Sequence, residues 1–210
     1  ASVGGKGASL GEMFRNLTSA GVKIPNGFSV TTEAFEVFVD QIVEPDCWLD
    51  VPEPEGDAEL REAAISASTL RESLQICFRD ANIADHLEMY GRTSLARAIV
   101  SETPVPQIVI NAIEDGYRGL CEQYGHGVDV AVRSSSTVED SAQASFAGQY
   151  ESFLNIQGSD NVVLHWLKGE GIQAATPTYH RDGLPVNAGP ITTFNEYSVV
   201  SENRVTAIPS

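Results

Sequence analysis

The sequence predicts a mixed α/β (α+β) domain with a helix-rich middle segment. Two observations predict this class: apolar residues recur at helical spacing in several segments before residue 124, and short apolar or alternating runs follow near residues 128–132 and 150–156. The chain has 210 residues, of which 42% are hydrophobic. That content is enough for a packed core and is too high for a disordered chain.

The first 42 residues predict two helices separated by a turn. A glycine-dense segment, 4–11, is expected to be a turn that opens into a helix, which Gly21 ends. Pro25-Asn26-Gly27 signals a turn before a short extended segment, and Thr31 or Thr32 can cap the next helix. The apolar faces of the two helices are Leu10, Met13, Phe14 and Leu17, and Phe35, Phe38, Val39 and Ile42.

The middle of the chain predicts a loop and then helices. Residues 44–59 are acidic and contain prolines, which is typical of a surface loop. Residues 58–124 are expected to be mostly helical, with breaks near Gly91 and near Pro104 and Pro106. The last helix has the apolar face Ile110, Ile113, Tyr117, Leu120 and Tyr124, and Gly125 and Gly127 are expected to end it.

The last third predicts two strands and an uncharacteristic tail. The run 128–132 indicates a buried strand with Arg133 at its end, followed by a polar loop to Gly148. In the second strand the residues predicted to share one half-buried face are Tyr150, Ser152, Leu154 and Ile156. Residues 165–210 show no long amphipathic period, so irregular structure, a poorly folded end and sequence joined from elsewhere all stay open.

Charge and cysteine content exclude several functions. The net charge is −16 and no basic patch is visible, which disfavours binding to nucleic acid or to an anionic membrane, and no run of 18 apolar residues predicts a membrane span. An acidic protein can still bind a nucleotide through local Lys and Arg, backbone N–H groups and a metal ion. Cys47, Cys77 and Cys121 lack zinc or disulfide spacing, which fits a reducing cytoplasm.

Three motifs could carry chemistry. In Gly4–Leu10, Lys6 stands among glycines ahead of a helix, which suits a phosphate group, although the motif is not a Walker A sequence. The alternative is a glycine-rich turn that only starts a helix. Arg133 after an apolar run needs an anion, which could be a phosphate or else Glu139 or Asp140.

The third motif is the small-residue segment 141–149, which precedes the second strand. Such a loop can close over phosphates with its backbone N–H groups and the Ser145 hydroxyl, while Phe146 excludes water. A plain β-hairpin connection is the alternative. The four histidines form no recognisable catalytic arrangement.

In this order along the chain, the motifs resemble the ATP-binding domain of the phosphoenolpyruvate synthase / pyruvate phosphate dikinase family. The resemblance covers about residues 3–42 and 128–164, and rifampicin phosphotransferase and glucan water dikinase share this type of domain. The segments that carry it are Val3–Met13, Gly21–Phe28, Val132–Asp140, Ala144–Gln149 and Phe153–Ile156.

The resemblance implies an ATP-grasp-like fold that holds ATP and Mg²⁺ between subdomains. Lys6 and Arg133 would contact the ATP phosphates and act in catalysis, and Ser145, Gly148 and Ser152 would complete the phosphate site. No residue is assigned as a metal ligand. Family members pass the β-phosphoryl group of ATP to a histidine on a swivelling domain and then to pyruvate. In a phosphoenolpyruvate synthase, ATP, pyruvate and water give phosphoenolpyruvate, AMP and phosphate.

The resemblance also divides the chain. Residues 1–164 are expected to be the N-terminal part of the ATP-binding domain, and residues 165–210 an atypical tail. A first strand, the second ATP-grasp half, the histidine domain and the pyruvate-binding barrel are expected outside this chain. A cytoplasmic location and a homo-oligomeric parent are compatible with it. The alternatives are a truncated non-catalytic remnant or binding module, and a pyruvate phosphate dikinase-like or rifampicin phosphotransferase-like enzyme.

Overall fold

The computed structural model describes residues 5–54, 57–136, 152–174 and 195–201. These residues belong to two compact units. We call residues 1–34, 107–166 and 194–210 the sheet unit, and residues 35–106 and 167–193 the helical unit. The predicted mixture of helices and strands is confirmed, since both units are rich in helix and the strands form a small antiparallel sheet.

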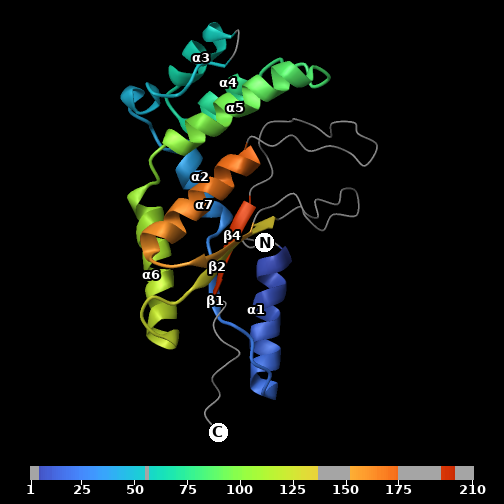
Figure 1. Cartoon of the computed structure of the whole chain (residues 1–210), viewed down its shortest axis with the longest axis vertical. Coiled ribbons are helices and arrows are strands. Elements are labelled where there is room, and N and C mark those ends of the chain that lie inside the picture. The colour runs from blue at the N-terminus through green and yellow to red at the C-terminus, as the bar shows by residue number, and fades with distance from the viewer. Residues whose placement is uncertain (1–4, 55–56, 137–151, 175–194, 202–210) are drawn as a thin grey trace. The chain divides into compact units, whose positions relative to one another are not determined.

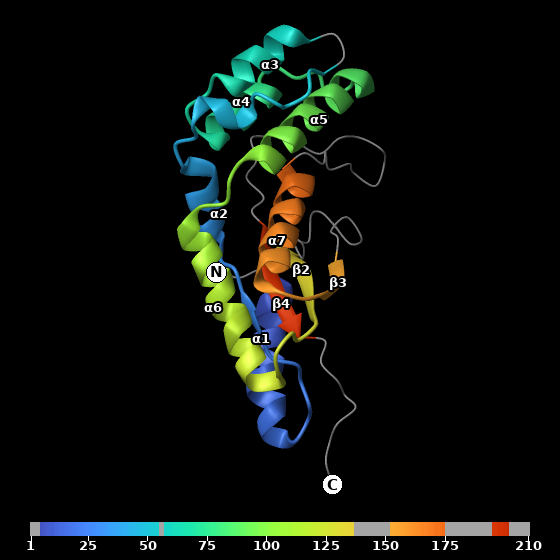
Figure 2. The same cartoon turned by 60° about the vertical axis from the view of Figure 1, so that its left-hand side comes forward.

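The sheet unit contains four strands in the order β1-β4-β2-β3, and every neighbouring pair is antiparallel. Helix α1 packs against β2 and β4, and α6 packs against β1. Figure 1 and Figure 2 show α1 on one side of the strands and the start of α7 on the other. The elements are α1 (Gly5–Leu17), η1 (Thr18–Ala20), β1 (Gly27–Ser29), α6 (Gln107–Tyr124), β2 (Val130–Ser136), β3 (Ser152–Ile156), β4 (Asn195–Ser201) and the first half of α7 (Ser159–Ala174), whose residues from 167 on belong to the helical unit.

The helical unit is built on a separate core. Helix α4 packs against α3 and α5, and η2 packs against α5. The indole N–H of Trp48, which is fully buried, donates a hydrogen bond of 2.9 Å to Thr103 Oγ1. The elements are α2 (Thr32–Asp40), η2 (Pro45–Trp48), α3 (Ala58–Ile65), α4 (Leu70–Phe78) and α5 (His86–Glu102).

Several predicted helix ends are confirmed. Gly21, Gly125 and Gly127 have φ values of 83°, 108° and 70°, a region that glycine enters without the steric cost of a Cβ atom. Each follows the helix that it was predicted to end. The apolar face of α6 is also confirmed at its centre, where Ile113, Tyr117 and Leu120 are buried.

Two helix predictions are wrong at the ends. The glycine-dense segment is not a turn ahead of a helix, because α1 already begins at Gly5. Ile42 is not on the buried face of the second helix: α2 ends at Asp40 and Ile42 is 84% exposed. The backbone of Ile42 instead forms an isolated bridge with Thr69, and this pairing replaces the next helical turn.

The middle segment also differs from its prediction. The stretch 44–59 is more than a surface loop, because Trp48 and Val51 are buried in the core of the helical unit. No break occurs at Gly91, which lies inside α5, whereas the break before α6 at Pro104 and Pro106 is present. Asp85 caps α5 and the helix continues past Gly91, because one glycine costs a helix only about 1 kcal/mol.

The strand predictions require two corrections. Arg133 lies within β2 rather than at its end, because pairing with β4 continues the backbone ladder through Ser136. On β3 the predicted half-buried face is wrong: Ser152 and Leu154 are exposed, whereas Phe153 is half-buried. Part of the tail is regular, since α7 runs to Ala174 and residues 195–201 form β4.

Candidate functional site

Lys6 lies in the first turn of α1, where it is exposed to solvent. The helix dipole places partial positive charge at this end, and the first turn contains no acidic residue to offset it. A mobile ammonium group is therefore added to a helix terminus that already favours anions.

Arg133 and Ser152 are brought together by the sheet. Their Cα atoms are direct partners in the β2–β3 pairing, and both residues are exposed. Directly opposite residues of an antiparallel pair point to the same face with Cβ atoms about 5 Å apart. Within the described ranges, no carboxylate forms an ion pair with Arg133. A guanidinium group and a hydroxyl group are thus presented side by side.

The face on which this pair lies follows from its neighbours. Val132 and Phe153, the adjacent partners, are buried and half-buried and point to the opposite face. The Phe153 ring contacts the His165 ring of α7, with a centroid distance of 4.9 Å. Because α1 lies on the other side of the strands from the start of α7 (Figure 1 and Figure 2), the face of the sheet that Arg133 shares with Ser152 is the face toward α1.

Two other predicted site residues, Ser145 and Gly148, lie outside the described residues. Glu139 and Asp140, the alternative partners for Arg133, also lie outside them. The structure therefore brings Arg133 and Ser152 together and places Lys6 on a helix that contacts the same strand.

Sequence reasoning missed the residue that joins the segment before β2 to the segment after β3. The Tyr117 hydroxyl donates to the carbonyl of Val128, before β2, and accepts from the N–H of Gly158, after β3, both at 2.9 Å. Burial raises the pKa of Tyr117, against the opposing effect of the Gly158 hydrogen bond, so the phenol keeps the proton that it donates. The helical spacing indicated only an apolar role for this tyrosine.

A second missed contact joins α6 to β1. The Phe28 ring lies so close to Gly116 that a Cβ atom at this glycine would be 2.7 Å from the ring. Gly116 therefore fixes how closely the strand approaches the helix. The signal in the sequence was a glycine inside an otherwise regular helix.

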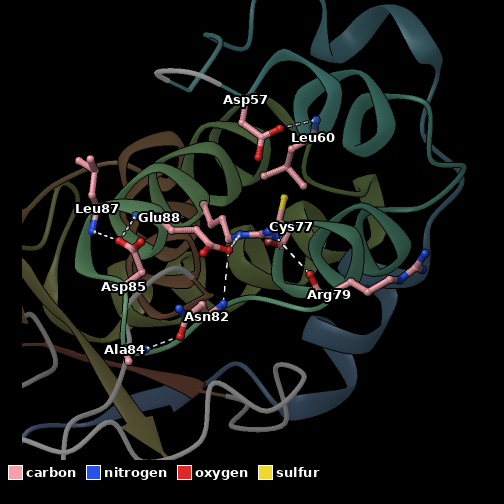
Figure 3. Close-up of polar contacts among 10 residues, drawn as sticks. Asp57, Leu60, Cys77, Arg79, Asn82, Ala84, Asp85, Leu87 and Glu88 are labelled. Carbon is pink, nitrogen blue, oxygen red and sulfur yellow. Dashed lines mark hydrogen bonds and ion pairs between the residues drawn. The ribbon is translucent and has the colours of Figure 1, made fainter.

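The helical unit has a hollow of about 270 Å³ whose charged residues are already engaged. Arg92 bonds Glu88 at 2.7 Å and the Cys77 carbonyl at 2.8 Å. Asp57 and Asp85 accept hydrogen bonds from N–H groups in the first turns of α3 and α5, which makes them helix caps (Figure 3). The hollow is lined by Pro54, Asp57, Leu60, Asp85, Leu87, Glu88, Gly91 and Arg92.

A metal site is not formed by the described part of the chain: no three His, Cys, Asp or Glu side chains there are grouped so that they could hold an ion. The described residues therefore offer no ligand set for the Mg²⁺ that the resemblance implies. Arg133 and Ser152 instead present a cationic donor and a hydroxyl donor, which are groups that phosphate oxygens accept from.

Comparison with known proteins agrees with this chemistry. The sequence profile of the family described as "Pyruvate phosphate dikinase, AMP/ATP-binding domain" matches residues 1–169. The chain belongs to this family. The predicted family resemblance is thus confirmed.

Several curated relatives match over the same region. A phosphoenolpyruvate synthase of Synechocystis sp. is 38% identical over 166 residues, 77% of this chain and 17% of the relative. A probable phosphoenolpyruvate synthase of Pyrococcus horikoshii is 35% identical over 168 residues, 77% of this chain and 20% of the relative. The Escherichia coli enzyme of the same name is 35% identical over 162 residues, again 77% of this chain and 17% of the relative.

The chain spans a fifth or less of the length of these relatives. Among the helices of the described residues, none has the length and apolar character needed to cross a membrane.

Proposed function

We propose that this chain supplies the phosphate-binding part of an ATP site. The observation that carries the proposal is the exposed Arg133–Ser152 pair, which lies on the α1 side of the sheet without a carboxylate partner in the described residues. Three other arginines, Arg71, Arg92 and Arg118, already bond carboxylates. A triphosphate would give Arg133 an anionic partner, which the described residues do not supply.

Each residue has a distinct part in the proposal. Arg133 donates to phosphate oxygens through its planar guanidinium group, whose fixed fork of N–H groups matches two oxygens at once. Lys6 adds a mobile point charge from the start of α1. Ser152 donates its hydroxyl proton beside Arg133, and the segment with Ser145 and Gly148 would cover the phosphates. These groups would stabilise negative charge as it redistributes during phosphoryl transfer.

The parent reaction that we propose is that of a phosphoenolpyruvate synthase-like dikinase with an ATP-grasp-like domain. ATP, pyruvate and water would give phosphoenolpyruvate, AMP and phosphate through a phosphohistidine outside this chain. Pyruvate would bind only to other domains, and Mg²⁺ would accompany ATP. A cytoplasmic location fits such an enzyme. In a full-length parent, Lys6→Ala or Arg133→Ala should lower turnover about 100-fold.

Calorimetric titration of ATP onto the chain tests the proposal. Micromolar binding of ATP is expected, and Lys6→Ala should weaken it by about tenfold because a charge-assisted contact is lost. Lys23→Ala is the matched control, because Lys23 is also exposed in the sheet unit but follows η1 rather than opening α1. Unchanged affinity in Lys6→Ala would contradict the assigned role. No ATP binding by the wild-type chain would favour a truncated remnant that needs other domains.

A further inference from the structure

The pairing of β2 with β3 changes register next to the candidate site. Val130 faces Ile156 and Arg133 faces Ser152. Between these two pairs β2 has two residues and β3 has three, so β3 contains one extra residue. An extra residue in one strand of an antiparallel pair is a β-bulge, and bulges re-aim the side chains that follow them.

The backbone identifies where the extra residue is accommodated. Asn155 has a φ of 57°, in the left-handed region, and it directly precedes Ile156. Asparagine enters this region more readily than other residues with a side chain, and β-branched residues almost never do. The asparagine at position 155 of β3 therefore matches the conformation that the bulge needs.

Without the bulge, a different residue would lie beside Arg133. Continuing the register of the Val130–Ile156 pair by three residues along each strand places Phe153 opposite Arg133. The one-residue shift would also turn Ser152 to the other face of the sheet. The exposures agree with the bulged register, since Arg133 and Ser152 are both exposed while Phe153 is half-buried against His165.

We infer that the bulge at Asn155 is the positioning device that puts a hydroxyl rather than a phenyl ring beside Arg133. Asn155 is a positioning residue in this account, because it acts through the register and not by touching the phosphates. The inference rests on the proposed ATP site for its functional meaning, whereas the register itself can be measured separately.

Three variants separate the register from other roles of Asn155. Asn155→Val disfavours the left-handed conformation and should shift the pairing. Asn155→Gly keeps that conformation without the side chain and is the matched control. Deletion of Asn155 removes the extra residue, so a regular strand then keeps Val130 opposite Ile156 and Arg133 opposite Ser152. The deletion should therefore behave like the wild type, which a simple loss of structure does not predict.

Two readouts decide the outcome. Cross-strand nuclear Overhauser contacts should join residues 133 and 152 in the wild type, in Asn155→Gly and in the deletion, and should move to residues 133 and 153 in Asn155→Val. ATP should bind at least about tenfold more weakly to Asn155→Val and within about twofold of wild type to the other two variants.

A retained 133–152 contact with normal ATP affinity in Asn155→Val would overturn the inference. Loss of ATP binding in all three variants would also overturn it, because it would assign Asn155 a direct contact. If Arg133→Ala leaves ATP binding unchanged, the proposed function fails while the nuclear Overhauser contacts still report the register. If Asn155→Val does not fold, the deletion and the glycine variant still test the inference.

Discussion

Two arginines of the helical unit, Arg71 and Arg92, have different surroundings from Arg133 of the sheet unit. In the helical unit Arg92 is mostly buried and bonds Glu88 and two backbone carbonyls, and Arg71 of α4 bonds Glu36 and Asp40 of α2. In the sheet unit Arg133 is exposed on a strand whose other residues hold it in place. The difference teaches that Arg71 and Arg92 stabilise the fold of the helical unit, whereas Arg133 is exposed and open to the phosphate role that we propose for it.

The largest expected effect is on stability, in the helical unit. Arg92→Ala removes bonds to Glu88 and to the carbonyls of Cys77 and Arg79, and should lower the free energy of unfolding by roughly 2–3 kcal/mol. Arg133→Ala should change it by less than about 0.5 kcal/mol, because an exposed side chain is removed. Urea denaturation of both variants measures the contrast. Equal losses would remove the distinction between the two arginines.

Two buried hydroxyl groups of the helical unit, those of Thr103 and Ser73, also differ in whether they have hydrogen-bond partners among the described residues. Thr103 Oγ1 accepts from Trp48 and donates to the Ile99 carbonyl at 2.6 Å, so Thr103→Val should cost about 2 kcal/mol. The equally buried Ser73 hydroxyl has no partner within the described residues, so Ser73→Ala should be neutral or stabilising. Thermal unfolding checks the order, and a costly Ser73→Ala would reveal a bond to a buried water molecule.

Two glycines of α6 offer a matched pair in the sheet unit. Gly116→Ala should destabilise the protein by about 1 kcal/mol, because the clash with Phe28 outweighs the gain in helix propensity. Gly119→Ala should stabilise it by up to about 1 kcal/mol, since its position is open. Chemical denaturation measures both changes. Stabilisation by both substitutions would show that β1 does not rest closely on this helix.

The smallest effect concerns alkaline pH. Burial raises the pKa of Cys77 from 9.0 to about 12. The folded state therefore disfavours the thiolate. The contribution of the Cys77 thiol to the free energy of unfolding is complete below pH 9 and is lost as the pH rises toward 12. From pH 9 to 10 the free energy of unfolding should fall by about 1 kcal/mol for this reason. Denaturation at both pH values should show a shallower decline in Cys77→Ala, and identical slopes would exclude this thiol as the cause.

The sequence predicted the features that depend on local chemistry. Helical spacing located α6, and glycines marked helix ends because positive φ values require them. The predicted face of β3 failed because one residue in the left-handed conformation inverts the alternation, and periodicity alone does not detect such a residue. Trp48 was missed because its burial depends on Thr103, which is distant in the chain.

In the candidate site, too, local sequence predicts some features, and contacts between distant segments determine the others. The residue types that suit phosphate, Lys6 and Arg133, were evident from the motifs and the family resemblance. The pairing of Arg133 with Ser152 and the hydroxyl bridge of Tyr117 depend on strand register and on packing between distant segments. Those relations could not be obtained from local sequence.

The most direct test of the central claim is the ATP affinity of Arg133→Ala beside that of Arg97→Ala. Arg97 is also an exposed arginine, but it lies on α5 of the helical unit. Calorimetric titration should show ATP binding weakened by at least about tenfold in Arg133→Ala, and unchanged in Arg97→Ala. Equal affinity in the two variants, with both folded, would contradict the assignment of Arg133 to the phosphates of ATP.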